Sequence, residues 1–265
     1  MKKEMMKITA EQAETIELLT IDAKENKDII ALILCGSLVK GTSTEHSDVD
    51  VFVMVTDEEF EKRKANKDYF CGTLFDQSKY PAPVDGKVVN KEYISRIWVD
   101  GNESVKGNFL QIKILFSHDL EVTDILNNAD KTNYDKAENI KKFYALMKSN
   151  RFKADDDMNN IMQVKFCIFN TVFFACRLAL AHNDIYYPCI KLIEKELAKC
   201  KELPDNFIAQ MRRVLETYSI DELEKFYDLT EEYFKQYRFD DKIRKGYVIE
   251  NEDFWFFKIR PYDEI

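Results

Sequence analysis

The sequence predicts an α/β protein in which an N-terminal domain with a mixed sheet, residues 1–130, is followed by an α-helical bundle, residues 131–265. Three observations lead to this prediction. Strand-like apolar runs and helical patterns alternate up to about residue 116, whereas only helical periodicity follows residue 137. The polar, turn-rich segment NNADKTNYDK at 127–136 separates the two halves. At 265 residues the chain is also long enough for two medium-sized domains.

The N-terminal elements follow from local patterns. Thr9 and Gln12 form a capping-box pattern that opens a helix over 9–25. The continuous apolar run at 29–35 has strand length and suits a strand that is covered on both faces. A short helix and a polar loop separate it from a second strand, which begins at Asp48 and ends at 55. The later elements are expected to be a helix from 57, a strand at 83–89, a helix at 91–99 and a strand at 111–116.

Gly36-Ser37 ends the first strand and has the chemistry of half a phosphate site. Without a Cβ, Gly36 lets the backbone turn tightly and lets a phosphate approach closely. The amides at the start of the following helix point free donors outward. Taken alone, a Gly-Ser pair is also typical of an ordinary strand-to-helix turn.

Asp48 and Asp50 open the second strand in the phrase Ser-Asp-Val-Asp-Val-Phe-Val. Because strand side chains alternate between faces, the two carboxylates share one face and Val49, Val51 and Val53 fill the other. Two carboxylates beside a phosphate-binding turn suit Mg²⁺, which binds carboxylates together with the phosphate oxygens of a substrate.

This combination, Gly36-Ser37-xxx-Gly41 followed by Asp48-x-Asp50, resembles the signature of the DNA polymerase β nucleotidyltransferase superfamily. The sequence around Asp48, Ser47-Asp48-Val49-Asp50, is similar to that of the small-molecule branch of this superfamily, which includes the aminoglycoside nucleotidyltransferases. The resemblance implies that Gly36 and Ser37 bind the triphosphate and that the aspartates hold two Mg²⁺ ions. It implies transfer of a nucleoside monophosphate from a nucleoside triphosphate, with ATP expected, to an acceptor hydroxyl with release of pyrophosphate.

Asp85 is the candidate for the third carboxylate that this superfamily places on a neighbouring strand. The resemblance therefore implies that Asp48, Asp50 and Asp85 are together the metal ligands and catalytic residues. Gly86 leaves a second interpretation open, because Asp-Gly also favours a hairpin turn. Lys87 falls on the strand face of Asp85, where it reaches either a phosphate or a carboxylate. If Asp85 is not the third ligand, the acidic run at 155–157 offers the replacement base.

In the second half of the chain, helical periodicity predicts helices near 137–152, 157–182, 188–201, 205–216 and 220–237. This helical domain is expected to bind the acceptor. Pro188 is expected at the first turn of a helix, where its missing N–H does no harm. The Tyr-Pro-x-x-Lys phrase resembles the helical half of bacterial small-molecule nucleotidyltransferases, which implies that Lys191 contacts the triphosphate; the alternative is a solvated lysine. The aromatic stretch 246–265 is expected to pack back as a strand or tail.

The amino-acid composition limits which binding partners and which cellular location we expect. The net charge of −9 argues against a nucleic-acid partner and is compatible with a cationic small acceptor. The opening residues lack the apolar core of a signal peptide, and polar residues interrupt the apolar helix at 157–182, so we expect a cytoplasmic protein without a membrane span. The six cysteines show no metal-ligand spacing and are expected to be reduced.

The function predicted from the sequence is a Mg²⁺-dependent nucleotidyltransferase that modifies a hydroxyl of a small molecule, with an aminoglycoside-type antibiotic as one candidate and antibiotic resistance as its consequence. One alternative is an enzyme of the antitoxin type that modifies a protein hydroxyl. The other is a noncatalytic regulator that binds nucleotides. The sequence leaves the oligomeric state open.

Overall fold

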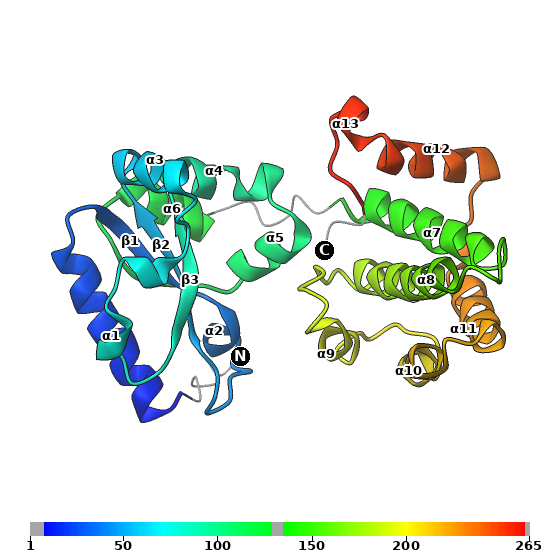
Figure 1. Ribbon diagram of the computed structural model, residues 1–265, viewed down its shortest axis with the longest axis horizontal. Helices are drawn as coiled ribbons and strands as arrows, with labels where there is room; N and C mark the ends of the chain where they lie inside the picture. The colour runs from blue at the N-terminus through cyan, green and yellow to red at the C-terminus, as the bar shows by residue number, and fades with distance from the viewer. Residues whose placement is uncertain (1–7, 129–134, 263–265) are drawn as a thin grey trace. The chain divides into compact units, whose positions relative to one another are not determined.

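The computed structural model describes residues 8–128 and 135–262, and the chain divides into two compact units, Met1–Asn133 and Tyr134–Ile265 (Figure 1). The boundary that the sequence predicts at residue 130 lies in the segment 129–134, outside the described residues. The first unit contains a mixed sheet with helices and the second is helical, which confirms the predicted α/β fold class.

The first unit is built on a four-stranded sheet in the order β3-β2-β1-β4. Its strands are β1 (Ile29–Leu34), β2 (Val49–Val55), β3 (Val84–Val89) and β4 (Lys113–Ser117). β1 pairs with β2 and β4 in antiparallel register, whereas β2 and β3 are parallel. The parallel pair requires a crossover, and the chain between β2 and β3 supplies it through α3 (Asp57–Asn66) and the 3₁₀ turns Cys71–Thr73 and Gln77–Lys79.

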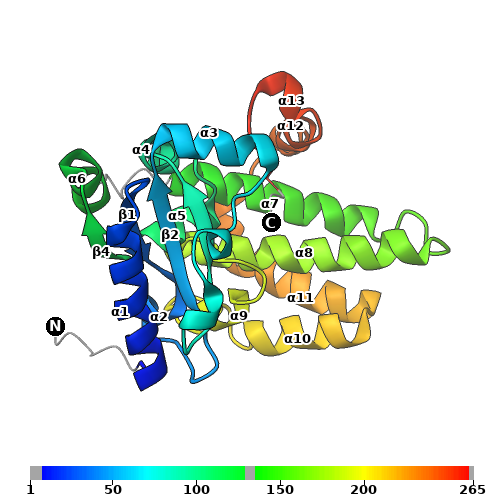
Figure 2. The same ribbon diagram turned by 60° about the vertical axis from the view of Figure 1, so that its left-hand side comes forward.

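Helices cover both faces of the sheet, as Figures 1 and 2 show. Helix α1 (Ala10–Glu25) packs on the face that carries Val49, Val51 and Val53, as the alternation of the second strand predicts. The opposite face carries Phe52 and Met54 and is covered by α4 (Lys91–Asp100), α5 (Glu103–Phe109) and α6 (Leu120–Asn128). Asp50 therefore belongs to the face of Phe52, at the end of the strand where helix α2 (Gly36–Lys40) begins.

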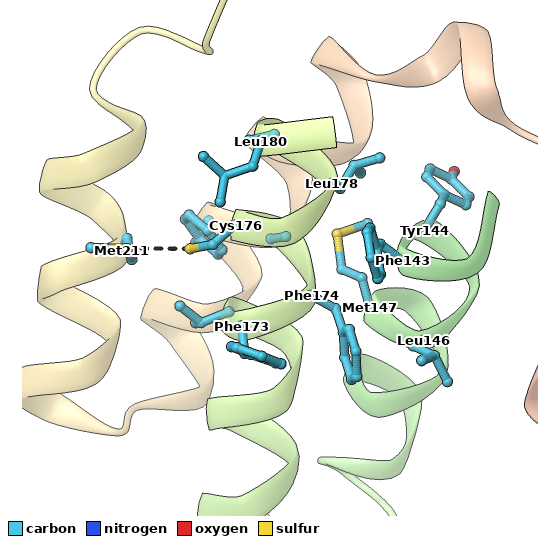
Figure 3. Close-up of a cluster of buried hydrophobic side chains, with 14 of the residues drawn as sticks. Phe143, Tyr144, Leu146, Met147, Phe173, Phe174, Cys176, Leu178, Leu180 and Met211 are labelled. Atoms are coloured by element: carbon cyan, nitrogen blue, oxygen red, sulfur yellow. Dashed lines mark hydrogen bonds between the residues drawn. The ribbon is translucent and has the colours of Figure 1, made fainter. Parts of the chain in front are cut away.

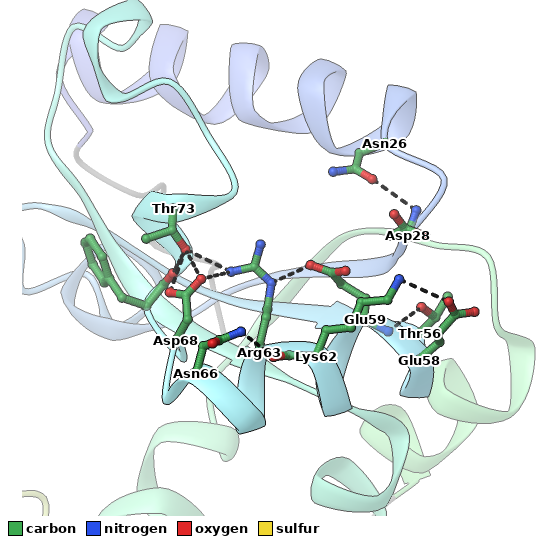
Figure 4. Close-up of polar contacts among 11 residues, drawn as sticks. Asn26, Asp28, Thr56, Glu58, Glu59, Lys62, Arg63, Asn66, Asp68 and Thr73 are labelled. Carbon is green, nitrogen blue, oxygen red and sulfur yellow. Dashed lines mark hydrogen bonds and ion pairs between the residues drawn. The ribbon is translucent and has the colours of Figure 1, made fainter.

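An ion-pair cluster fixes the crossover beside β3 (Figure 4). The Arg63 guanidinium, 11% exposed, donates to Glu59 at 2.7 Å and to Asp68 at 2.8 Å, and it also donates to the Thr73 hydroxyl at 2.8 Å. The Tyr69 carbonyl, one residue after Asp68, accepts from the Val88 amide at 2.8 Å. The cluster thus holds a short extended segment against the outer edge of β3.

The second unit is a bundle around α8 (Ile161–His182), which contacts its neighbours α7, α9, α10 and α11. The other helices are α7 (Lys136–Lys153), α9 (Ile193–Leu197), α10 (Phe207–Thr217), α11 (Ile220–Tyr233), α12 (Asp241–Glu252) and α13 (Phe254–Phe257), with a 3₁₀ turn at Lys235–Tyr237. Figure 2 shows α7, α8, α10 and α11 lying alongside one another. Figure 3 shows the core between them, in which the Cys176 thiol of α8 contacts the Met211 sulfur of α10 at 3.4 Å.

Helix α8 is the single described helix that is long and apolar enough to cross a membrane by length and composition. Of its most apolar 18-residue window, 83% is buried inside the protein. The apolar surface of α8 is thus used as the core of the bundle.

Three predictions for the helical half are wrong. The helix expected over 188–201 forms only at Ile193–Leu197, so Pro188 lies in a non-helical segment before it. The helix expected from residue 157 begins at Ile161, where the Asn160 side chain caps it. The tail expected from residue 246 is instead helical, because Gly246 lies within α12 and the aromatic run forms α13. In the first unit, α5 was not predicted.

Candidate active site

Gly36 occupies the turn between β1 and α2 for two separate reasons. Its φ of +71° lies in the left-handed region that favours glycine. A Cβ at this position would also lie 2.0 Å from Asp50 Oδ2 and 2.6 Å from Asp50 Cγ, far inside van der Waals contact. The Asp50 carboxylate therefore lies directly against the backbone of the Gly-Ser turn.

Asp50 and Asp85 are direct partners in the parallel pairing of β2 with β3. Paired residues of adjacent strands present their side chains on the same face, so both carboxylates lie on the face of Phe52. Gly86 follows within the strand, and a Cβ there would lie 1.9 Å from the Val51 carbonyl oxygen. Close approach of the backbones explains this glycine, and the hairpin-turn interpretation of Asp85-Gly86 is wrong.

The pKa values of two buried thiols indicate that the carboxylates of Asp50 and Asp85 lie nearby. Burial, reinforced by the charge of Asp50 and more weakly by that of Asp85, raises the pKa of Cys35 to about 12. Burial followed by the charge of Asp85 and then that of Asp50 raises the pKa of Cys71 to about 12. Each thiol lies close enough to both aspartates for their negative charge to oppose its ionisation. Asp50 and Asp85 thus concentrate negative charge at the N-terminal ends of β2 and β3.

Asp48 is exposed and lies immediately before β2, two residues from Asp50. The loop that leads to it is anchored by Gln12 of α1, whose buried side-chain amide donates to the carbonyl oxygens of Thr44 at 3.0 Å and Ser47 at 2.9 Å. Thr15, one turn later, accepts a hydrogen bond from the Ala82 amide at 2.9 Å. Helix α1 therefore fixes the entries of both strands that carry the aspartates.

The donor set has the chemistry for Mg²⁺ but is not a complete protein cage. Among residues 8–128 and 135–262, no group of three or more His, Cys, Asp or Glu side chains is arranged to hold a metal ion. Mg²⁺ commonly binds one or two carboxylates and takes its remaining ligands from water and substrate phosphates. The paired, partly exposed carboxylates of Asp50 and Asp85 fit that mode of binding.

Lys40 is a cation of this region that the sequence analysis did not select. It ends α2, is half-buried, and its ammonium donates to the Asn108 side chain of α5 at 2.9 Å. The Lys40 charge lowers the pKa of Cys35, whereas Asp50 and Asp85 raise it, so Lys40 lies near the same turn. The signal was present in the sequence, because Lys40 follows Gly36 by four residues and α2 is about one turn long.

The structure shows the local surroundings of the other residues that the sequence suggested. Lys87 is exposed on β3, two residues after Asp85, and its backbone bridges to Phe70. Lys191 is exposed in a turn of the helical unit, two residues before α9. In the acidic run 155–157, Asp155 forms an ion pair with Arg151 at 2.7 Å, which is a structural use of that carboxylate.

Comparison with known proteins supports a nucleotidyltransferase assignment for part of the first unit. Residues 18–79 match the family described as polymerase beta, nucleotidyltransferase, and this segment contains Gly36, Ser37, Asp48 and Asp50. No curated protein matches the chain significantly. A solved nucleotidyltransferase-like protein from Exiguobacterium sibiricum 255-15 is 13% identical, with a TM-score of 0.43 over 96% of this chain and 81% of that chain. The resemblance to the superfamily is confirmed, while the small-molecule branch stays a prediction. Residues 18–79 of this chain thus match the nucleotidyltransferase family of polymerase beta.

Proposed function

We propose that the protein transfers a nucleoside monophosphate from a nucleoside triphosphate, with ATP expected, to a hydroxyl of a small molecule and releases pyrophosphate. The observation that carries the proposal is the register of Asp50 with Asp85 directly beside the Gly36 turn. This register brings two carboxylates to a backbone that a phosphate can approach. The exposed Asp48 supports the proposal as a third carboxylate at the same end of β2.

With the triphosphate bound, Asp48, Asp50 and Asp85 would supply carboxylates to two Mg²⁺ ions whose other ligands are water and phosphate oxygens. When bound, these ions neutralise the triphosphate and lower the pKa of the acceptor hydroxyl. The oxygen of the acceptor forms the new bond to the α-phosphorus while the bond from that phosphorus to the pyrophosphate oxygen breaks. Asp85, the exposed member of the aligned pair, would take the proton of the hydroxyl. Asp50 is held against Gly36 and would orient the triphosphate.

The turn after β1 would bind the phosphates. Gly36 carries no side chain of its own that would keep a phosphate away from the turn, and Ser37 adds a hydroxyl at the start of α2. Lys40, anchored by Asn108, supplies a positive charge near the same turn for the β- and γ-phosphates. A contact of Lys191 with the triphosphate remains part of the proposal and needs its own variant.

The acceptor is proposed to be a hydroxylated small molecule, and a cationic one such as an aminoglycoside is favoured by charge. The chain carries 48 acidic and 39 basic side chains, and Asp50 and Asp85 add their field at the site. Such a field attracts cations and opposes the backbone of a nucleic acid.

The test is mass spectrometry of a cell extract incubated with the protein, Mg²⁺ and isotope-labelled triphosphates. We expect one small molecule to gain the mass of a nucleoside monophosphate with wild type and with Glu45→Gln, which removes an exposed carboxylate from the loop before β2. Asp50→Asn and Asp85→Asn should form none. Label on a protein would refute the small-molecule acceptor, and no labelled product from any triphosphate would refute the transfer itself.

A further inference from the structure

The helical unit contains a hollow of about 480 Å³ that the nucleotide chemistry does not use. Helices α7 and α11 form its walls, and Arg238, just after the last 3₁₀ turn, closes one side. A hollow of this volume is in the range of small-molecule sites in proteins. Its lining combines two aromatic rings with charged groups of both signs: Phe152, Tyr227, Lys148, Asp228, Glu231 and Arg238.

Glu231 forms the fixed polar floor of the hollow. Its side chain lines the hollow although the residue is only 8% exposed. The Tyr144 hydroxyl donates to it at 2.5 Å and the Arg238 guanidinium at 2.7 Å. Burial opposes its ionisation, but the hydrogen bonds from Tyr144 and Arg238 outweigh burial and lower the pKa of Glu231. The hollow is therefore built around a buried carboxylate that is ionised at neutral pH.

Two donors at this floor keep capacity for a ligand. The Tyr227 hydroxyl donates to Glu231 at 3.3 Å, and the Lys148 ammonium donates to Glu231 at 3.4 Å. Both hydrogen bonds are longer than those from Tyr144 and Arg238. An ammonium has three donors, and a hydroxyl can accept as well as donate. Both groups can thus bind an oxygen of a ligand without giving up the internal network.

The rim is anionic at one position. Glu232, also in the lining, forms ion pairs with Lys235 and, at 3.8 Å, with Arg238. Asp228 is exposed, lines the hollow and forms no ion pair within the described ranges. A ligand ammonium at Asp228 would complete the charge pairing of the lining.

We propose that this hollow is a binding site for a small hydroxylated amine. Its ammonium pairs with Asp228, its hydroxyls bind Lys148 and Tyr227, and its carbon skeleton packs on the rings of Phe152 and Tyr227. Phe152 is 50% exposed, so its ring is available for this contact. The site stands independently of the proposed nucleotide transfer.

Isothermal titration of the full chain, without nucleotide or Mg²⁺, tests the proposal with glucosamine at a pH where its amine is protonated. N-acetylglucosamine keeps the ring and lacks the charge, and gluconate carries the opposite charge. We expect saturable binding of glucosamine and at least tenfold weaker binding of the other two, because a charge-assisted hydrogen bond to Asp228 is lost.

Asp228→Asn should weaken glucosamine binding about tenfold and leave the melting temperature unchanged, since Asp228 is exposed. The matched control is Asp221→Asn, which removes an exposed carboxylate from the first turn of the same helix, away from the lining, and should leave binding unchanged. No binding of glucosamine to wild type, equal binding of N-acetylglucosamine, tighter binding of gluconate, or an unaffected Asp228→Asn variant would each overturn the proposal.

Discussion

Replacing Gly36 by alanine separates the two reasons for glycine in the candidate site. A φ of +71° costs an L-residue about 1–2 kcal/mol relative to glycine. In addition, the new Cβ would lie 2.0 Å from Asp50 Oδ2, whereas ordinary contact begins near 3.4 Å. The carboxylate must therefore be displaced, and a displacement of about 1 Å in a positioned group reduces turnover about 100-fold.

Gly41→Ala provides the matched control. Gly41 ends the same helix with a φ of +66°, and nothing lies within 4 Å of an added Cβ. It should lose about 1–2 kcal/mol of the free energy of unfolding and keep near wild-type turnover. Gly36→Ala should be less stable than Gly41→Ala and nearly inactive. Urea denaturation and pyrophosphate release measure both quantities; equal stability and equal turnover of the two variants would refute the contact between Gly36 and Asp50.

Three further predictions follow from the contacts of the first unit. Asp50→Asn should retain less than about a tenth of wild-type turnover, with an unchanged or slightly higher melting temperature, because it removes one of two aligned carboxylates; a drop in melting temperature would contradict this reasoning. Arg63→Met should lower the free energy of unfolding by about 3 kcal/mol in urea, since it removes the shared cation of two partly buried carboxylates, Glu59 and Asp68. Lys62→Met, at an exposed ion pair, should have no measurable effect; equal effects would show that the cluster is not structural. Because the pKa of Cys35 is raised to about 12, its thiol stays protonated below that pH, and at pH 8 iodoacetamide should modify the half-buried Cys189 before Cys35 in peptide mass mapping; the reverse order would contradict the raised pKa.

The sequence was most informative where the chemistry is encoded locally. Gly36 and Ser37 follow an apolar strand directly, and the alternation of Val49, Val51 and Val53 with Asp50 assigns the carboxylate to one face of β2. Such period-two patterns depend on the strand itself and not on distant parts of the chain. The fold class and the resemblance to the polymerase β superfamily could therefore be predicted.

Residues whose roles depend on distant partners were harder to interpret. Asp85-Gly86 has the local chemistry of a turn, and only the close approach of Val51 on the neighbouring strand makes it part of β3. Gln12 was recognised as a helix-capping residue, yet its amide also anchors the loop that precedes Asp48. No spacing rule within the sequence connects Gln12 with that loop.

The errors in the helical half have similar causes. Pro188 suits the first turn of a helix, but the chain continues without helix until Ile193. Gly246 weakens helical propensity, and an aromatic run suits a strand, so local preference argued against helices there. Packing of α12 on α7 overrides that preference.

The central claim, that Asp50 and Asp85 hold Mg²⁺ for a triphosphate, is tested most directly by the melting temperature of wild type and of Asp50→Asn with ATP, in Mg²⁺ and in chelator. Until Mg²⁺ joins them, the carboxylates repel the triphosphate, so ATP should raise the melting temperature of wild type only with Mg²⁺. At an ATP concentration 100 times its Kd, the stabilisation is about 2.7 kcal/mol. Asp50→Asn should show no shift with ATP, either in Mg²⁺ or in chelator. An equal shift in chelator, or an unchanged shift in Asp50→Asn, would contradict the account.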